Sequence, residues 1–165
     1  MLLGWSEWEE DSCKSGCLEG SKGVKIRRRT CKRRGLKAGN CRGPYYDVIL
    51  CDHSKLCNSY KTISAYASQK CSEFSKFLNL TDVLTRGFQH SHSLDDPSIA
   101  CTIFCQPKEF YWFMELRKEL IDYDVDPYFP DGTLCYREDN QNYYCRQHYC
   151  LPENHSFIEK CKYPC

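Results

Sequence analysis

The cysteine content constrains this chain more than any other feature of its sequence. There are 14 cysteines in 165 residues, an even number, and they run from Cys13 to Cys165. This density indicates a disulfide framework formed in an oxidising compartment. Two N-glycosylation sequons, at Asn79 and Asn154, agree with that compartment. We therefore expect a secreted, extracellular protein held together largely by disulfides.

The start of the chain bears on how it reaches that compartment. The apolar residues MLLGW are too few for the apolar region of a signal peptide and run directly into acidic residues. No stretch of the sequence is long enough and apolar enough to span a bilayer. We expect the chain to be part of a longer secreted protein, or the product of an incomplete gene model.

The cysteines fall into two groups of even size. Six lie between Cys13 and Cys57, and eight lie between Cys71 and Cys165. The segment between the groups, NSYKTISAYASQK, is rich in small and polar residues, as linkers are. Each group can therefore close its own disulfides.

The charges divide at the same place. Residues 1–58 hold 12 Lys or Arg and 7 Asp or Glu, a net charge of +5. Residues 59–165 hold 11 and 15, a net charge of −4. This asymmetry favours two modules with different partners. We predict modules over residues 1–58 and 71–165, joined by a linker over residues 59–70.

The first module has few Leu, Ile and Val residues to fill an ordinary core. In the segment RRRTC, an extended strand places Arg27 and Arg29 on one face and Arg28 on the other. The upstream tryptophans, Trp5 and Trp8, can lie against the first two guanidiniums, which are planar and weakly hydrated. We predict a stack of these tryptophans with Arg27 and Arg29.

This spacing resembles a thrombospondin type 1 repeat. W-x-x-W is followed by C-x-x-x-C, R-x-R-x-C and three more cysteines, and the match covers residues 5–57. The resemblance implies a thin three-stranded ribbon and C-mannosylation of Trp5. In the family, the residue before the second cysteine often carries an O-fucosylated hydroxyl, but here it is Gly16, so we expect no fucose there. The implied disulfides are Cys13–Cys51, Cys17–Cys57 and Cys31–Cys41.

The second module has a different cysteine pattern. It contains ACTIFC, the aromatic segment FYWFMELRKELI, the turn PDGTLC and the segment YYCRQHYC. This order resembles the cysteine-rich domain that follows the central thrombospondin repeat in ADAMTS proteases and ADAMTS-like proteins, and the joint resemblance covers about residues 5–151. We expect the aromatic segment to be a buried strand, with a helix as the alternative. By comparison with the family, residues 122–129 look inserted.

The second resemblance also implies disulfides. The implied pairs are Cys71–Cys105, Cys101–Cys145 and Cys135–Cys150. We expect Cys161 and Cys165, which lack their usual family partners, to pair with each other. The predicted fold class is small, disulfide-rich and mostly β: an elongated three-stranded thrombospondin type 1 ribbon followed by an irregular α+β cysteine-rich domain.

We expect no catalytic site, no metal site and no cofactor in this chain. The metalloprotease motif H-E-x-x-H is absent from the sequence. His90 and His92 form an H-x-H in a polar loop, but disulfide-bonded cysteines would not supply thiolate ligands beside them. Asp131-Gly132-Thr133 predicts a turn before a disulfide.

A basic run is the better functional candidate. Between Lys22 and Arg42 there are ten Lys or Arg and no Asp or Glu. With two arginines assigned to the stack, the remaining candidates for glycan binding are Arg28, Lys32, Arg33, Arg34 and Lys37. In a secreted protein a dense basic patch meets sulfated glycans before it meets nucleic acid. The alternative is a solvated face that keeps the module soluble.

The resemblance implies a function for the whole chain. It implies a non-catalytic exosite or matrix-binding part of a secreted ADAMTS-type zinc metalloendopeptidase that acts in the extracellular matrix. The expected partners are sulfated glycosaminoglycans and matrix proteins, with no nucleic acid and no membrane span. The alternative is an ADAMTS-like matrix glycoprotein without a protease domain. A free-standing cystine-rich toxin or growth factor would require a signal peptide close to Met1.

Overall fold

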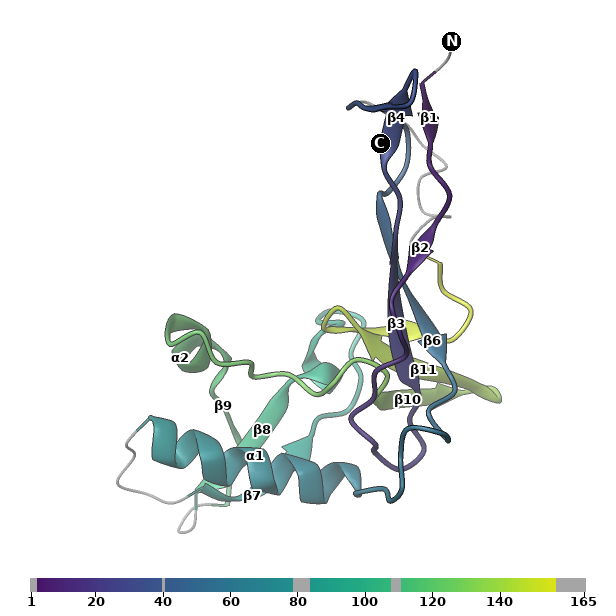
Figure 1. The fold of residues 1–165 in the computed structure, drawn as a ribbon. Coiled ribbons are helices and arrows are strands. Elements are labelled where there is room, and N and C mark those ends of the chain that lie inside the picture. Colours follow the sequence, from purple (N-terminus) through teal and green to yellow (C-terminus); the bar gives the residue numbers. More distant parts are fainter. Residues whose placement is uncertain (1–2, 40, 79–83, 108–110, 157–165) are drawn as a thin grey trace.

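The computed structural model describes residues 3–39, 41–78, 84–107 and 111–156. A long, narrow ribbon rises from a more compact body, so that the molecule has the shape of an L (Figure 1). The first module forms the ribbon and the second forms the body. Within the described residues there are four three-stranded sheets, and every pairing in them is antiparallel. The predicted fold class, disulfide-rich and mostly β, is confirmed.

The ribbon consists of two three-stranded sheets placed end to end. The lower sheet has the order β2 (Glu9–Glu10), β3 (Gly23–Arg28), β6 (Tyr46–Cys51). The upper sheet has the order β1 (Gly4–Trp5), β4 (Cys31–Arg33), β5 (Leu36–Lys37). The central strands β3 and β4 follow each other directly along the chain, so the two sheets form one continuous ribbon.

Disulfides replace an apolar core in this ribbon. Each contributes roughly 2–4 kcal/mol to stability, which matters where few aliphatic side chains are buried. Among the ribbon residues that the structure describes, the buried apolar side chains other than cysteines are Leu18 and Val48. Its disulfides are Cys13–Cys51, Cys17–Cys57 and Cys31–Cys41, the same pairs that the resemblance implied.

The expected linker over residues 59–70 must be corrected, because most of it is helical. The helix α1 spans Ile63–Phe77, and the side chain of its N-cap residue, Thr62, accepts a hydrogen bond from a backbone N–H of the first turn at 3.1 Å. Ala67 is fully buried, and a Cβ atom at Gly87 would overlap with the Ala67 backbone. The small residues that suggested a linker instead let helix and strand approach closely.

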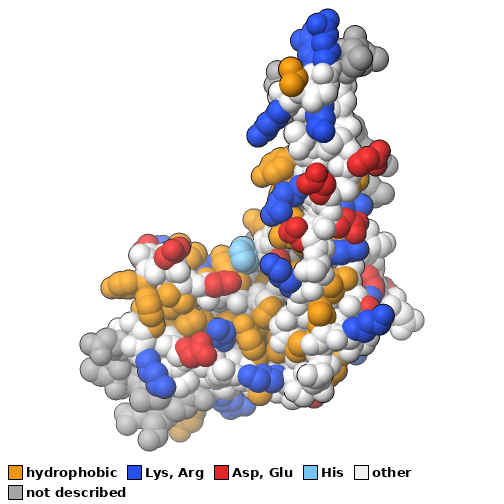
Figure 2. Space-filling view, viewed as in Figure 1, with side chains coloured by type: hydrophobic (Ala, Val, Ile, Leu, Met, Phe, Trp, Pro, Cys, Tyr) orange, Lys and Arg blue, Asp and Glu red, His pale blue; other side chains and the backbone are white. Residues whose placement is uncertain are grey.

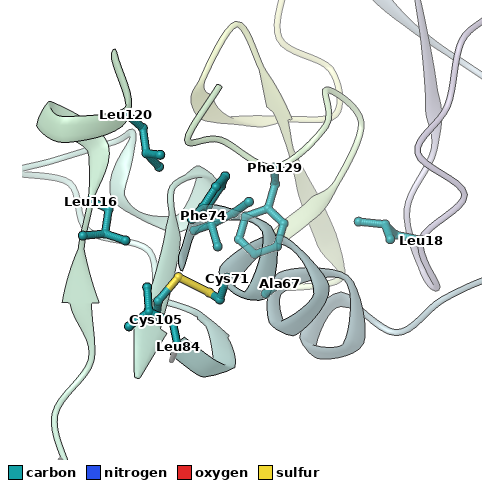
Figure 3. Close-up of a cluster of buried hydrophobic side chains, with 10 residues drawn as sticks. Leu18, Ala67, Cys71, Phe74, Leu84, Cys105, Leu116, Leu120 and Phe129 are labelled. Atoms are coloured by element: carbon teal, nitrogen blue, oxygen red, sulfur yellow. A yellow bond between two sulfur atoms is a disulfide. The ribbon is translucent and has the colours of Figure 1, made fainter. Parts of the chain in front are cut away.

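The helix α1 covers a sheet that forms the centre of the body. The sheet has the order β7 (Leu84–Gln89), β8 (Ile103–Pro107), β9 (Met114–Glu115). The disulfide Cys71–Cys105 ties the helix to the middle strand. The buried cluster between them (Figure 3) comprises Leu18, Ala67, Cys71, Phe74, Leu84, Ile103, Cys105, Leu116, Leu120 and Phe129. Because Leu18 belongs to the ribbon, this core crosses the boundary between the modules.

The aromatic segment does not form the buried strand that we expected. Tyr111 is 97% exposed and Trp112 is 59% exposed. Beyond the short strand β9, the chain forms the helix α2, Arg117–Asp122. Leu116 and Leu120 are four residues apart, share one face of this helical turn and are both buried. The helical alternative therefore holds for the second half of the segment, where the apolar spacing is four rather than two.

Residues 122–129, which looked inserted, are an integral part of the body. Phe129 is 2% exposed and belongs to the core. The backbone N–H of Ile103 donates to the carbonyl of Pro127 at 2.9 Å, and that of Phe129 donates to the carbonyl of Cys101 at 2.8 Å. The segment thus hydrogen-bonds to the chain at the start of β8 and covers the core with Phe129.

The last sheet packs beside a short 3-10 helix, η1 (Ile99–Cys101). The sheet has the order β10 (Leu134–Glu138), β11 (Gln141–Arg146), β12 (Tyr149–Pro152). The disulfides Cys101–Cys145 and Cys135–Cys150 lie here and are again the pairs that the resemblance implied. The expected pair Cys161–Cys165 lies outside the described residues.

Ribbon and body are joined by direct contacts as well as by the chain. The backbone N–H of Lys22 donates to the carbonyl of Gly132 at 2.9 Å, and that of Leu134 donates to the hydroxyl of Ser21 at 2.9 Å. Gly16 packs so closely on the ring of Pro130 that an added Cβ atom would lie 2.6 Å from its Cγ. The L shape is therefore a packed arrangement of two modules.

Candidate functional site: the basic tip of the ribbon

The four side chains predicted to stack do lie together in the ribbon. The guanidinium carbon of Arg29 lies 4.3 Å from the ring centroid of Trp5 and 4.4 Å from that of Trp8. The guanidinium carbon of Arg27 lies 4.8 Å from the ring centroid of Trp8. Arg27 also forms a 2.9 Å ion pair with Asp47, which is 2% exposed. These two arginines are therefore structural.

Hydrogen bonds fix the upper end of this stack. The indole Nε1 of Trp5 donates to the carbonyl of Arg42 at 2.7 Å, and Nε of Arg29 donates to the carbonyl of Pro44 at 3.0 Å. Burial, and then the neighbouring Arg27, lower the pKa of Arg29. The stack thus anchors the segment that returns from the tip to the body.

Above the stack, a hairpin displays a group of exposed cations. The strands β4 and β5 are joined by the two-residue turn Arg34-Gly35, and the disulfide Cys31–Cys41 closes the loop around them. We call this hairpin the basic tip; its exposed cations are Lys32, Arg33, Arg34 and Lys37. Figure 2 shows Lys and Arg side chains gathered at the upper end of the ribbon, with few acidic side chains among them.

Two features of the basic tip work against its own stability. Lys32 and Lys37 are direct cross-strand partners, and like charges placed opposite each other destabilise a strand pair. Arg34 adopts φ of 54° and Gly35 φ of 77°, the left-handed conformations of a turn that favours Asn-Gly. Neither feature favours the isolated hairpin.

Arg28, for which we expected no structural role, has an ion-pair partner in the structure. Its Nη1 lies 3.3 Å from a carboxylate oxygen of Asp11. On the same strand, Nζ of Lys25 lies 2.7 Å from a carboxylate oxygen of Glu10. Acidic residues at and just after β2 therefore pair with two cations of β3. The role of Arg28 in glycan binding stays a prediction. In the described part of the chain, no ion pair involves Lys32, Arg33, Arg34 or Lys37.

The predicted modification sites are only partly described. Asn154 is exposed, and its side-chain oxygen accepts a hydrogen bond from Gln141 at 2.9 Å. Asn79 lies outside the described residues. Trp5 is half-buried in the stack. Glycosylation of the two asparagines and C-mannosylation of Trp5 stay predictions.

The histidines of the H-x-H motif pack against aromatic rings. His90 lies 5.3 Å from the ring of Phe104, and His92 lies 4.9 Å from the ring of Tyr136. Burial lowers the pKa of His92, and Glu138 opposes this shift. One group of potential metal ligands occurs among the described residues: Cys101, Cys135 and Cys145. All three are in disulfides and therefore offer no thiolate.

Sequence reasoning missed Arg146, which is 2% exposed where ribbon and body meet. Its guanidinium donates to the carbonyls of Val48 at 3.3 Å, His155 at 2.9 Å and Pro152 at 2.6 Å. One cation thus bonds β6 of the ribbon to the end of the body, and burial lowers its pKa. The sequence signal that could have pointed to Arg146 is its position directly after Cys145, between aromatic and cysteine residues in YYCRQHYC.

The chain resembles a known protein along most of its length. Over 144 residues it is 26% identical to "A disintegrin and metalloproteinase with thrombospondin motifs 2" of Mus musculus, in an alignment covering 86% of this chain. The chain spans only 11% of the length of that relative. No protein-family model matches the chain, and no solved structure matches it.

The similarity and the disulfides together indicate an extracellular protein. No helix in the described part of the chain has the length and hydropathy needed to cross a membrane. With its similarity to that relative and its six described disulfides, the chain fits an ancillary cysteine-rich region of the ADAMTS family, and the resemblance predicted from the sequence is confirmed.

Proposed function

We propose that this chain is a non-catalytic extracellular module that binds sulfated glycosaminoglycans through its basic tip. The observation that carries the proposal is the pairing of Lys32 with Lys37 across a hairpin whose turn residue, Arg34, is in a left-handed conformation. Both features are unfavourable for the free hairpin. A polyanion that binds these cations would offset the repulsion between them.

The shape of the ribbon suits such a ligand. The stack of Trp5, Arg29, Trp8 and Arg27 stiffens the ribbon below the tip, and the disulfide Cys31–Cys41 holds the cations in a small volume. Because the charges are close together, their fields add over a Debye length of about 8 Å at physiological ionic strength. The acidic body lies at the other end of the ribbon (Figure 1) and opposes the attraction little.

The same module would act as a tether in a larger protein. Binding to matrix glycans raises the effective concentration of whatever is linked to the module near its target. In an ADAMTS-type protease this tether would serve a zinc metalloendopeptidase domain, and in an ADAMTS-like protein it would serve matrix organisation alone. An H-E-x-x-H segment encoded upstream in the same transcript would decide for the protease.

Heparin-affinity chromatography of the disulfide-bonded chain tests the glycan proposal. The triple variant Lys32→Ser, Arg33→Ser, Arg34→Ser should elute at much lower salt than the unmodified chain, because counterions released on binding make the affinity strongly salt-dependent. A control variant that removes the same charge from exposed sites elsewhere carries Lys55→Ser, Lys118→Ser and Arg137→Ser. Equal elution of the two triple variants would show that the basic tip is a solvated face.

A further inference from the structure

A cleft lies at the inner corner of the L, where the ribbon meets the body. Its volume is about 370 Å³. The ribbon contributes Lys14, Ser15, Gly16 and Val24, and the body contributes Asp126, Phe129, Pro130, Asp131 and His148. The cleft is far from the basic tip, because Lys14 and Val24 pair at the lower end of the ribbon. Any ligand of this cleft would therefore be distinct from the glycan ligand proposed above.

Two carboxylates, Asp126 and Asp131, line this cleft, and neither forms an ion pair within the described residues. Asp131 accepts a hydrogen bond from the backbone N–H of Gln147 at 3.0 Å through Oδ1, and Asp126 accepts one from the N–H of Tyr128 at 2.9 Å, also through Oδ1. Within the described residues, neither the Oδ2 atom of Asp126 nor that of Asp131 forms a hydrogen bond or an ion pair. Partial burial raises the pKa of Asp131 above its usual value, and the negative charge of Asp126 adds to this shift. The hydrogen bond from Gln147 and the charges of His148 and Arg146 oppose it.

The wall beside these carboxylates is flat and held in place. His148 sits in the two-residue turn between β11 and β12, with φ of 72°, and Gln147 before it has φ of 53°. The hydrogen bond from Gln147 to Asp131 fixes this turn. The imidazole of His148 stacks on the ring of Tyr128 at 3.8 Å. His148 lines the cleft, whereas Tyr128 does not, so the stacked imidazole is available to a ligand.

The remaining lining of the cleft is largely apolar. Phe129 and Pro130 line it from the body, and Val24 lines it from the ribbon. The one ammonium group in the lining belongs to Lys14, which is exposed and forms no ion pair within the described residues. The carboxylates favour a cation, the imidazole favours a planar group, and the apolar lining favours an apolar stem. A planar cation on an apolar stem therefore matches all three parts of the cleft.

We propose that this cleft binds an arginine side chain of a protein partner, with the guanidinium between Asp126 and Asp131 and the methylene stem over Pro130. The planar fork can donate to both free carboxylate oxygens at once, and its flat face can lie on the imidazole of His148. A lysine ammonium would satisfy the charge but neither the fork nor the stacking.

The test is a titration of the ¹⁵N-labelled, disulfide-bonded chain followed by two-dimensional NMR. The probes are N-acetyl-arginine methylamide and its neutral isostere N-acetyl-citrulline methylamide. The arginine probe should shift the amide signals of Gln147, His148 and Gly16 in a saturable way, and the citrulline probe should leave them unchanged. Equal shifts with the two probes would overturn the proposal.

Two variants locate the binding. Asp131→Asn and Asp126→Asn each keep the Oδ1 acceptor for the backbone N–H, so both turns should persist, but each removes one charge. Each should weaken binding of the arginine probe about tenfold, the cost of losing one charge-assisted hydrogen bond. The control Asp95→Asn removes an exposed carboxylate outside the cleft and should bind as the unmodified chain does. Unchanged binding in Asp126→Asn and Asp131→Asn, with native spectra, would also overturn the proposal.

Discussion

Lys22 of the ribbon and Gly132 of the body approach each other so closely that only glycine fits at the second position. The backbone N–H of Lys22 donates to the carbonyl of Gly132 at 2.9 Å. A Cβ atom on Gly132 would overlap with the carbonyl oxygen of Lys22. Gly132 also has φ of 94°, a conformation that other residues rarely adopt. An ion pair between Lys22 and Glu153 closes the same contact from the outside.

Substitution of Gly132 should therefore loosen the junction. We expect Gly132→Ala to lower the free energy of unfolding by about 2–4 kcal/mol, because backbone strain and the overlap with Lys22 act together. Thermal unfolding followed by circular dichroism measures this change. Gly39→Ala is the control, since nothing lies within 4 Å of a Cβ atom there. Equal melting temperatures for the two variants would contradict the close contact.

The arginine between the two tryptophans should not be replaceable by lysine. Arg29→Lys keeps the charge but removes the planar group that lies 4.3 Å from Trp5 and 4.4 Å from Trp8. We expect a loss of about 0.5–2 kcal/mol in the free energy of unfolding, measured by denaturant titration with tryptophan fluorescence. Arg33→Lys, at an exposed position of the tip, should unfold at the denaturant concentration of the unmodified chain.

The turn of the basic tip should show a conflict between stability and binding. Arg34→Asn creates an Asn-Gly turn, for which the observed φ values of 54° and 77° are favourable. We expect the free energy of unfolding to rise by about 0.5–1 kcal/mol, while heparin elution moves to lower salt. Arg34→Lys, which keeps the charge and gains no turn propensity, should change neither property. A loss of stability in Arg34→Asn would show that the arginine supports the fold.

The half-buried carboxyl of Asp131 in the cleft gives a prediction with a defined pH dependence. Burial raises the pKa of Asp131 above its usual value, so its ionised form destabilises the folded chain. The cost is absent below the unfolded pKa of about 3.9, grows as the pH rises towards the folded pKa, and is complete above it. Asp131→Asn should therefore stabilise the chain at pH 7 and have no such effect at pH 3. Urea unfolding at both pH values, with Asp95→Asn as the control, measures the difference.

Much of the ribbon could be predicted from local spacing. An extended strand alternates its faces, so Arg27 and Arg29 had to share one, and two tryptophans upstream were the available partners. The ion pair of Arg28 was missed because its partner, Asp11, follows a two-residue strand that is too short to recognise from sequence. The pairing of Lys32 with Lys37 depends on the register of a two-residue turn, which the charge run alone does not reveal.

The body was harder to predict because its contacts join distant residues. Ala67 and Gly87 are small because helix and strand backbones touch there, yet small residues in sequence also indicate a linker. Phe129 closes the core from a segment that also carries the exposed residues Asp122, Asp124 and Asp126. Arg146 bonds to the ribbon across 98 residues of sequence. Local patterns carry no information about these partners.

The packing of Gly16 on Pro130 has an evolutionary consequence. A repeat tied to its neighbour only by a linker can be exchanged by recombination for another repeat of the same fold. Here any residue larger than glycine, including the hydroxyl residue that related repeats often carry, would bring a side chain within 2.6 Å of the Pro130 ring. A foreign repeat would therefore displace the ribbon from the body, so the two modules should be inherited as one unit.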